Sequence, residues 1–171
     1  SRAIDSLAIT AIVFLVLAAT PHETPAASPS KPNVIIFLAD DLGWSDVGFH
    51  GEDVIETPSL DRLAAEGAEL HRFYSTPICS PTRAALMTGR DPMRLGVVYG
   101  VIMPWMNNGI HPAEHFMPES FRAAGYQTAM VGKWHLGHAQ ETYTPRSRGF
   151  EHFYGHLHSE VGYFPPFANQ G

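Results

Sequence analysis

Residues 34–39 read VIIFLA, an apolar run that is rich in β-branched side chains and has no polar interruption. A strand with one face in water would alternate apolar and polar residues. This run therefore predicts a strand that is buried on both faces of a mostly parallel sheet. A second apolar run, at residues 127–131, predicts another strand.

Residues that start and stop helices lie around these two runs. Residues 57–67 combine a threonine cap, a proline in the first turn and a closing glycine, and they predict a helix. Similar signals predict a helix that Ser80 caps and Gly89 ends, and another at residues 118–124. The alternation of helices and apolar strands indicates an α/β fold, with a mostly parallel central sheet sandwiched by helices.

Two further segments have no clean period. Residues 68–74 are expected to be extended, although their alternation is impure. Residues 96–118 are rich in Gly, Pro and Asn, and we expect a long irregular connection there. Such connections in compact domains are often functional.

Composition excludes several classes of protein. The chain has 171 residues, 44% hydrophobic and 16% charged, which suits one globular core and not a disordered tail. A net charge of -6 without a Lys/Arg cluster argues against a nucleic-acid partner, because phosphate backbones are bound by concentrated positive charge. The single cysteine, Cys79, excludes an internal disulfide.

The amino-terminal segment has the pattern of an export signal. Arg2 precedes an apolar run at residues 7–19, and small residues follow it. We therefore expect a signal peptide or N-terminal anchor at residues 1–20, a Pro/Ala/Ser-rich linker at 21–31, and the folded part at 32–171. The chain opens on Ser1 and its end has no terminal character, so we expect a piece of a longer protein.

Cys79 is expected at the amino-terminal end of its helix. The unpaired N–H groups there favour an anion, and Arg83, one turn along, adds a fixed positive charge. Local sequence thus allows two interpretations: a site for an oxyanion, or a small buried cysteine beside a helix.

Polar residues follow both predicted strands. Asp40 and Asp41 leave the first, and Lys133 and His135 follow the second. Ligands of α/β sheets bind outside the carboxyl ends of the strands, where these side chains are expected. Two adjacent carboxylates suit a hard divalent cation, and the alternative is that one caps a turn while the other is solvated.

Four segments together resemble a known family, the type I sulfatases of the alkaline phosphatase superfamily. They are residues 32–43 (PNVIIFLADDLG), residues 79–83 (CSPTR), which match the C-x-P-x-R signature, residues 125–137 (GYQTAMVGKWHLG), and residues 148–150 (RGF). The resemblance covers about residues 31–171. It implies an alkaline-phosphatase-like α/β fold, truncated at the C-terminus, with 32–171 as the N-terminal part of the catalytic domain.

The resemblance also implies the roles of the site residues. Cys79 would be oxidised to formylglycine by a modifying enzyme that reads the motif, and its hydrated aldehyde would be the nucleophile. Asp40, Asp41 and the modified Cys79 would bind a metal, calcium or magnesium. Arg83, Lys133 and His135 would contact the nucleophile and the sulfate, with His135 as the base.

The implied activity is hydrolysis of sulfate monoesters of aryl alcohols or sugars by an exported enzyme: periplasmic or secreted, or lysosomal in an animal. Two alternatives stay open, a phosphodiesterase or phosphonate hydrolase of the same superfamily, and a non-catalytic secreted binding protein. Further metal ligands and the leaving-group acid are expected beyond residue 171, so the 171-residue piece is expected to be inactive. Three histidines are expected at the rim or surface: His152, His156 and His158. The sequence predicts no oligomeric state.

Overall fold

The computed structural model describes residues 31–52 and 54–160, so the predicted signal lies outside the described residues. The chain divides into two compact units, residues 1–39 and 40–171. Within the described residues, no helix is both long enough and apolar enough to cross a bilayer.

The predicted strand at residues 34–39 is wrong. This segment of the first unit has no regular secondary structure, and its side chains are exposed, with Ile35 at 74% and Phe37 at 85%. A strand needs a neighbour to accept and donate its backbone hydrogen bonds. In the described part of the chain, the only ladder between strands joins two other segments.

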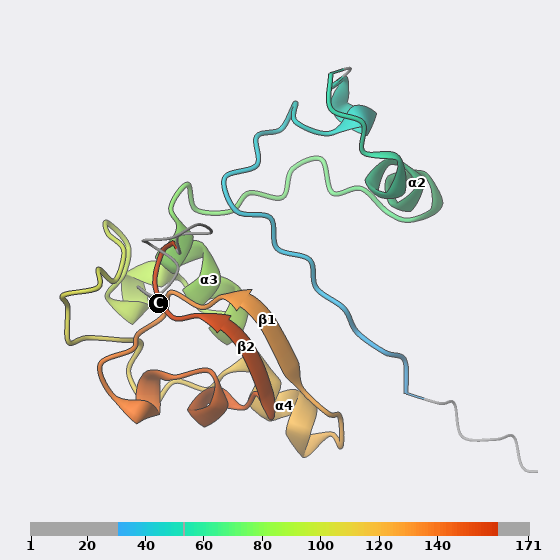
Figure 1. Ribbon diagram of the computed structural model, residues 1–171. Coiled ribbons are helices and arrows are strands. Elements are labelled where there is room, and N and C mark those ends of the chain that lie inside the picture. Colours follow the sequence, from blue (N-terminus) through green and yellow to red (C-terminus); the bar gives the residue numbers. More distant parts are fainter. Residues whose placement is uncertain (1–30, 53, 161–171) are drawn as a thin grey trace, which may run out of the picture. The chain divides into compact units, whose positions relative to one another are not determined.

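That ladder is the parallel sheet of the second unit. Strands β1 (Ala129–Lys133) and β2 (His152–His156) pair in parallel, with Val131 opposite Tyr154. The connection between them contains two short 3₁₀ helices, η3 (Glu141–Tyr143) and η4 (Arg146–Arg148). Figure 1 shows the two strands side by side in orange and red. The predicted α/β class with a parallel sheet is confirmed.

Three α-helices confirm the predicted helical segments within two residues at each end. They are α2 (Pro58–Glu66), α3 (Cys79–Thr88) and α4 (Met117–Ala123). Two more 3₁₀ helices are η1 (Gly48–His50) and η2 (Pro92–Leu95). Residues 68–74 contain a turn and no strand, so the predicted extended segment is not a strand. Residues 96–116 are irregular, as expected.

The start of α3 differs from the prediction. Its N-cap is Ile78, in extended conformation, and not Ser80, so Cys79 is the first helical residue. Gly89 ends the helix as predicted, because its φ of 67° is left-handed and its N–H reaches Ala85 O. The Ser80 side chain is thereby free for a contact outside the helix.

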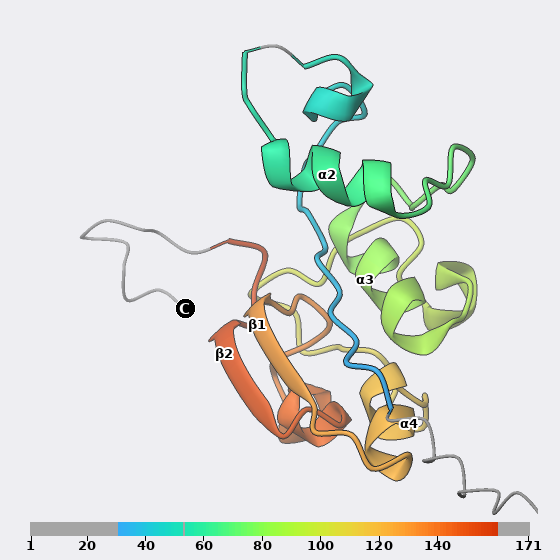
Figure 2. The same cartoon turned by 90° about the vertical axis from the view of Figure 1, so that its right-hand side faces the viewer.

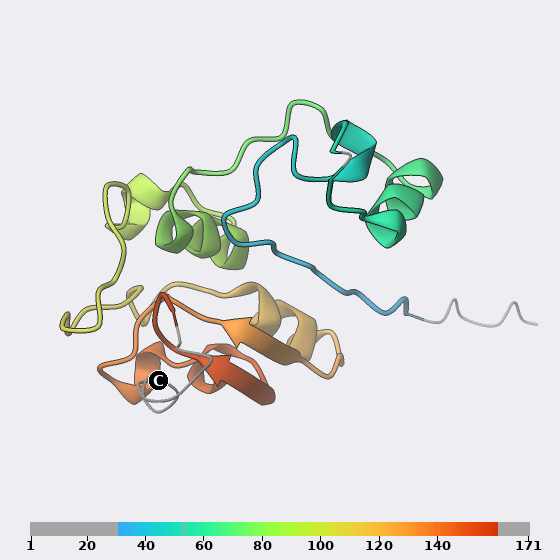
Figure 3. The ribbon, with the colours of Figure 1, turned by 45° about the horizontal axis from the view of Figure 1, so that its top comes forward.

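The hydrophobic core lies where α3, the irregular connection and the segment after β1 meet. Figures 2 and 3 show α3 and α4 on the same side of β1 and β2. Trp134 is 1% exposed and packs its ring 5.8 Å from Phe116 and 6.3 Å from Phe150. The other buried members of this core are Ala84, Met87, Val97, Ile102, Ile110 and Leu136. Trp134 separates Lys133 from His135, so core packing fixes the backbone from which both side chains leave.

Candidate active site

Asp40 is the point where residues from three segments meet. Its Oδ2 accepts a hydrogen bond from Lys133 Nζ at 2.6 Å, and its Oδ1 accepts one from Arg83 Nη2 at 3.2 Å. Partial burial raises the pKa of Asp40, but the hydrogen bonds from Lys133 and Arg83 outweigh it and hold the pKa below its ordinary value. The carboxylate is therefore ionised between two cations.

Arg83 joins α3 to the carboxyl end of β1. Its guanidinium is buried and donates through Nη1 to the backbone oxygen of Lys133, while Nη2 reaches Asp40. Its Nε is buried without a partner among the described residues. A fixed, always charged fork is the side chain best suited to orient a carboxylate and a sulfate together.

His135 is held neutral. It is 1% exposed, and burial is the main reason that its pKa falls to about 4, with Lys133 and Arg83 lowering it further. Its Nε2 lies 3.1 Å from the backbone oxygen of Ile102, which can only accept. The proton of the neutral ring therefore sits on Nε2, and Nδ1 carries a lone pair. Nδ1 is buried and has no partner in the described part of the chain.

Two site residues have strained backbones. Asp41, with φ of 56°, and His135, with φ of 61°, are the described non-glycine residues with positive φ. Such conformations cost about 1–3 kcal/mol each and collect at functional sites. Their coincidence with the sequence-predicted residues supports a functional role for both positions.

Cys79 is partly buried and forms no disulfide. As the first residue of α3, it lies beside the unpaired N–H groups of the first turn, which favour an anion. Arg83 lies one turn further along the same helix. The predicted placement of Cys79 at a helix N-terminus is thus confirmed, one residue inside the helix.

A metal site is only partly supplied by these residues. Asp40 and Asp41 have the hard oxygen donors that calcium and magnesium prefer, and both residues are exposed. Calcium takes six to eight oxygen ligands. No group of three or more His, Cys, Asp or Glu side chains suited to a metal is found in the part of the chain that the structure describes. The oxygen donors of these residues fit a hard cation, but they are too few to complete its coordination shell.

Ser80 is a site residue that the sequence did not single out for this role. Its hydroxyl is fully buried and donates to the backbone oxygen of His135 at 2.8 Å. The Ser80 hydroxyl oxygen itself accepts a hydrogen bond from the N–H of Ile102 at 3.3 Å. The sequence shows that Ser80 follows Cys79, but it does not show that the distant residues Ile102 and His135 contact Ser80 in the folded chain.

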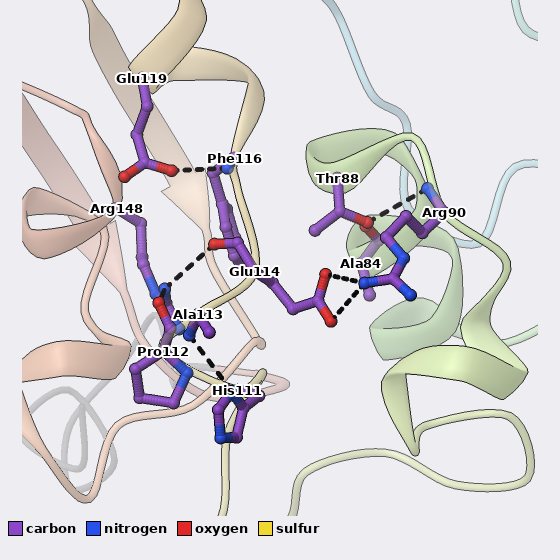
Figure 4. Close-up of polar contacts among 10 residues, drawn as sticks. All are labelled: Ala84, Thr88, Arg90, His111, Pro112, Ala113, Glu114, Phe116, Glu119 and Arg148. Carbon is purple, nitrogen blue, oxygen red and sulfur yellow. Dashed lines mark hydrogen bonds and ion pairs between the residues drawn. The ribbon is translucent and has the colours of Figure 1, made fainter.

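Arg148 is the second residue whose role sequence reasoning missed. It is 3% exposed and donates to three backbone oxygens, those of Ile110, Pro112 and Glu114. Figure 4 shows its guanidinium beside this loop, with the Glu114 side chain turned the other way, to an ion pair in which both carboxylate oxygens accept from Arg90 Nη1. Arg148 also lies over the ring of Phe116, at 4.7 Å, and so supports the ring that packs on Trp134.

In the described residues, the side chains of the three expected rim histidines form no hydrogen bond or ion pair with the site residues, although the backbone of His156 lies opposite Lys133 in the strand ladder. His152 is exposed, and His156 and His158 are half-buried. His156 Nδ1 bonds the backbone oxygen of His158, whose ring meets that of His138 at 4.3 Å. Their positions agree with the expectation of rim or surface residues.

Comparison with known proteins identifies the family. Residues 32–164 match the family described as Sulfatase. This chain belongs to the sulfatase family. It is 43% identical to N-acetylgalactosamine-6-sulfatase of Rattus norvegicus over 153 residues, which are 85% of this chain and 28% of the relative. It is 44% identical to arylsulfatase A of Homo sapiens over 126 residues, or 72% of this chain and 25% of that one.

The fold has solved counterparts. The crystal structure of Ps i-CgsB in complex with k-i-k-neocarrahexaose matches with a TM-score of 0.63 and 35% identity, covering 74% of this chain and 28% of that one. The chain therefore spans between a quarter and a third of the length of these relatives.

Proposed function

We propose that this chain carries the nucleophile and the cationic half of a sulfatase active site, which hydrolyses sulfate monoesters of sugars or aryl alcohols. The observation that carries the proposal is the meeting of Arg83 and Lys133 on one carboxylate, Asp40, with Cys79 one helical turn from Arg83. The names of the relatives, a sugar sulfatase and an arylsulfatase, support this class of substrate. The neighbour in complex with k-i-k-neocarrahexaose favours an oligosaccharide.

In this proposal Cys79 is converted to formylglycine by a modifying enzyme that reads residues 79–83. The hydrated aldehyde supplies one hydroxyl to attack sulfur and a second whose deprotonation expels sulfate and restores the aldehyde. Its position at the start of α3 aims the helix N–H groups at the anion. An unmodified cysteine has no second hydroxyl and could not complete the cycle.

Lys133 and Arg83 hold the negative charge of the sulfate group. Lys133 is 12% exposed and Arg83 8%, so their charges act in a partly desolvated place, where electrostatic interactions are stronger than in water. His135 takes the proton of the second hydroxyl on Nδ1, because Nε2 is occupied at Ile102 O. Its low pKa keeps that lone pair available at neutral pH.

Asp40 and Asp41 would hold a divalent cation, calcium or alternatively magnesium, through their carboxylate oxygens. A bound cation would polarise a sulfate oxygen and lower the pKa of the nucleophile. Because two carboxylates cannot complete a calcium shell, its other ligands would be the modified Cys79 and residues outside the described part of the chain. Residues 1–20 would direct export, so that the enzyme meets sulfated material outside the cytoplasm.

Paired assays on the intact protein test this function. We expect release of nitrophenol from nitrophenyl sulfate, weaker turnover of bis-nitrophenyl phosphate, and no turnover of either by Cys79→Ala. A clear preference for the phosphodiester would favour a phosphodiesterase instead. An inactive protein that keeps an alkylatable Cys79 and binds a sulfated sugar would favour a binding protein.

A further inference from the structure

Ser80, which follows Cys79 in α3, forms a closed ring of hydrogen bonds with Ile102 and His135. Ser80 Oγ donates to His135 O at 2.8 Å, Ile102 N donates to Ser80 Oγ at 3.3 Å, and His135 Nε2 donates to Ile102 O at 3.1 Å. All three residues are buried, at 0%, 2% and 1% exposure. One serine hydroxyl thus touches the backbone oxygen of His135 and the N–H of Ile102, the residue whose carbonyl receives the His135 ring.

Two side chains hold the backbone of Ile102, one on each side of its Cα. It lies in the irregular connection, where no helix or strand ladder orients the backbone. Its N–H is held by Ser80 and its oxygen by His135. The direction of this carbonyl decides which nitrogen of the His135 ring carries the proton, because a carbonyl only accepts.

The backbone of His135 also needs an anchor. A φ of 61° is costly for a residue with a Cβ and persists only when the surroundings determine it. The His135 N–H bonds Leu157 O at 3.1 Å, next to β2, and its oxygen bonds Ser80. Ser80 therefore supplies one of the two backbone contacts that hold the strained residue.

We propose that Ser80 is a positioning residue for the sulfatase reaction: its hydroxyl sets the direction of the His135 ring, so that Nδ1 faces the group formed from the neighbouring Cys79. This inference rests on the proposed function. Without the hydroxyl, the Ile102 N–H and the His135 backbone oxygen lose their shared partner, so the backbones that carry and receive the ring can shift and the ring can turn. Lys133 and Arg83, which hold the sulfate, do not bond Ser80.

The test measures kcat and KM of Ser80→Ala, Ser80→Thr and Thr88→Ala in the intact protein, with nitrophenyl sulfate. Each rate is divided by the fraction of converted Cys79, read by mass spectrometry of the tryptic peptide at residues 73–83. Thr88→Ala is the matched control, because it removes a hydroxyl from the same helix that bonds Ala84 O and is not a hydrogen-bond partner of His135.

For Ser80→Ala we expect kcat to fall about 10- to 100-fold, the cost of a small misplacement of a reacting group, with KM within about twofold. Ser80→Thr keeps the hydroxyl and is expected to recover most of kcat. Thr88→Ala is expected to stay within about twofold of the wild type, since the Thr88 hydroxyl bonds only nearby backbone groups, Ala84 O and Arg90 N. If Ser80→Ala does not fold, Ser80→Cys takes its place, because a thiol is a weak donor of similar size. We then expect a measurable loss of kcat that is smaller than the loss expected for Ser80→Ala.

Wild-type kcat in Ser80→Ala, or in Ser80→Cys where that variant replaces it, would overturn the inference and leave the proposed function intact. Equal losses in Ser80→Ala and Ser80→Thr would overturn it as well, because the hydroxyl would then not matter. A wild-type protein with converted Cys79 and no sulfate ester hydrolysis would overturn the proposed function, and this inference with it.

Discussion

Acid should destabilise this protein through His135. The pKa of the buried ring is about 4, and the ordinary histidine value is 6.5. Above pH 6.5 the ring is neutral in both folded and unfolded chains and contributes nothing to pH dependence. As pH falls below 6.5, the unfolded chain binds a proton that the folded chain refuses. The free energy of unfolding therefore falls until pH 4, where the folded ring is protonated too.

The size of the effect follows from the pKa difference. Each unit is 1.36 kcal/mol, so the shift from 6.5 to about 4 amounts to about 3 kcal/mol. His135→Gln is the informative variant, because its amide can still donate to Ile102 O but does not titrate. We expect the variant to lack this part of the acid destabilisation, whatever its stability at pH 7.

Denaturant unfolding of the wild type and of His135→Gln between pH 7.5 and pH 4 measures this difference in acid destabilisation. The wild type should lose about 3 kcal/mol more than His135→Gln over this range, since all other titrating groups are shared. Parallel curves would refute the reasoning and would mean that the His135 ring is solvated in the folded protein.

Three further substitutions have distinct expected outcomes. Arg148→Met leaves three backbone oxygens without their donor and should lower the free energy of unfolding by about 3 kcal/mol or more. The melting temperature should fall accordingly, and an unchanged melting temperature would contradict the role of this side chain. Lys133→Met removes the 2.6 Å bond to Asp40 and should lower kcat/KM for nitrophenyl sulfate about 100- to 1,000-fold, so a loss under tenfold would count against its proposed role. Asp41→Gly relieves the positive φ and should stabilise the calcium-free protein by about 0.5–1 kcal/mol. The same variant should show no rise in melting temperature when calcium is added. A rise equal to that of the wild type would exclude Asp41 as a calcium ligand.

The local elements were largely predictable from the sequence. Proline and glycine act through the chain's own φ angles, so α2, α3 and α4 began and ended within two residues of expectation. The second apolar run became β1, displaced by two residues toward Lys133. Lys133 therefore belongs to the strand, and its side chain is fixed by the sheet.

Pairing between distant segments was less predictable. The apolar run at residues 34–39 has the composition of a strand, but composition does not supply the neighbour that a strand needs. The opposite error concerns β2, which reads HFYGH and was not predicted because histidine and glycine break the apolar pattern. Its backbone still pairs with β1, since the ladder needs only N–H and C=O groups.

The candidate site was predictable in its charged residues and not in their supports. Charged residues that follow apolar runs or lie in a short motif are visible in a sequence, and the structure brings Asp40, Arg83 and Lys133 together. The supports, Ser80 and Arg148, act through bonds to backbone oxygens, whose positions depend on the path of the irregular connection. The residue type alone does not predict such a bond.

Mass spectrometry of the tryptic peptide at residues 73–83, taken from active intact protein, tests the central claim most directly. We predict that Cys79 appears as an aldehyde, lighter than the thiol by the exchange of CH₂–SH for CHO, and that hydrolysis of nitrophenyl sulfate rises in proportion to the converted fraction. A fully alkylatable Cys79 thiol in a preparation that hydrolyses the sulfate ester would contradict the account.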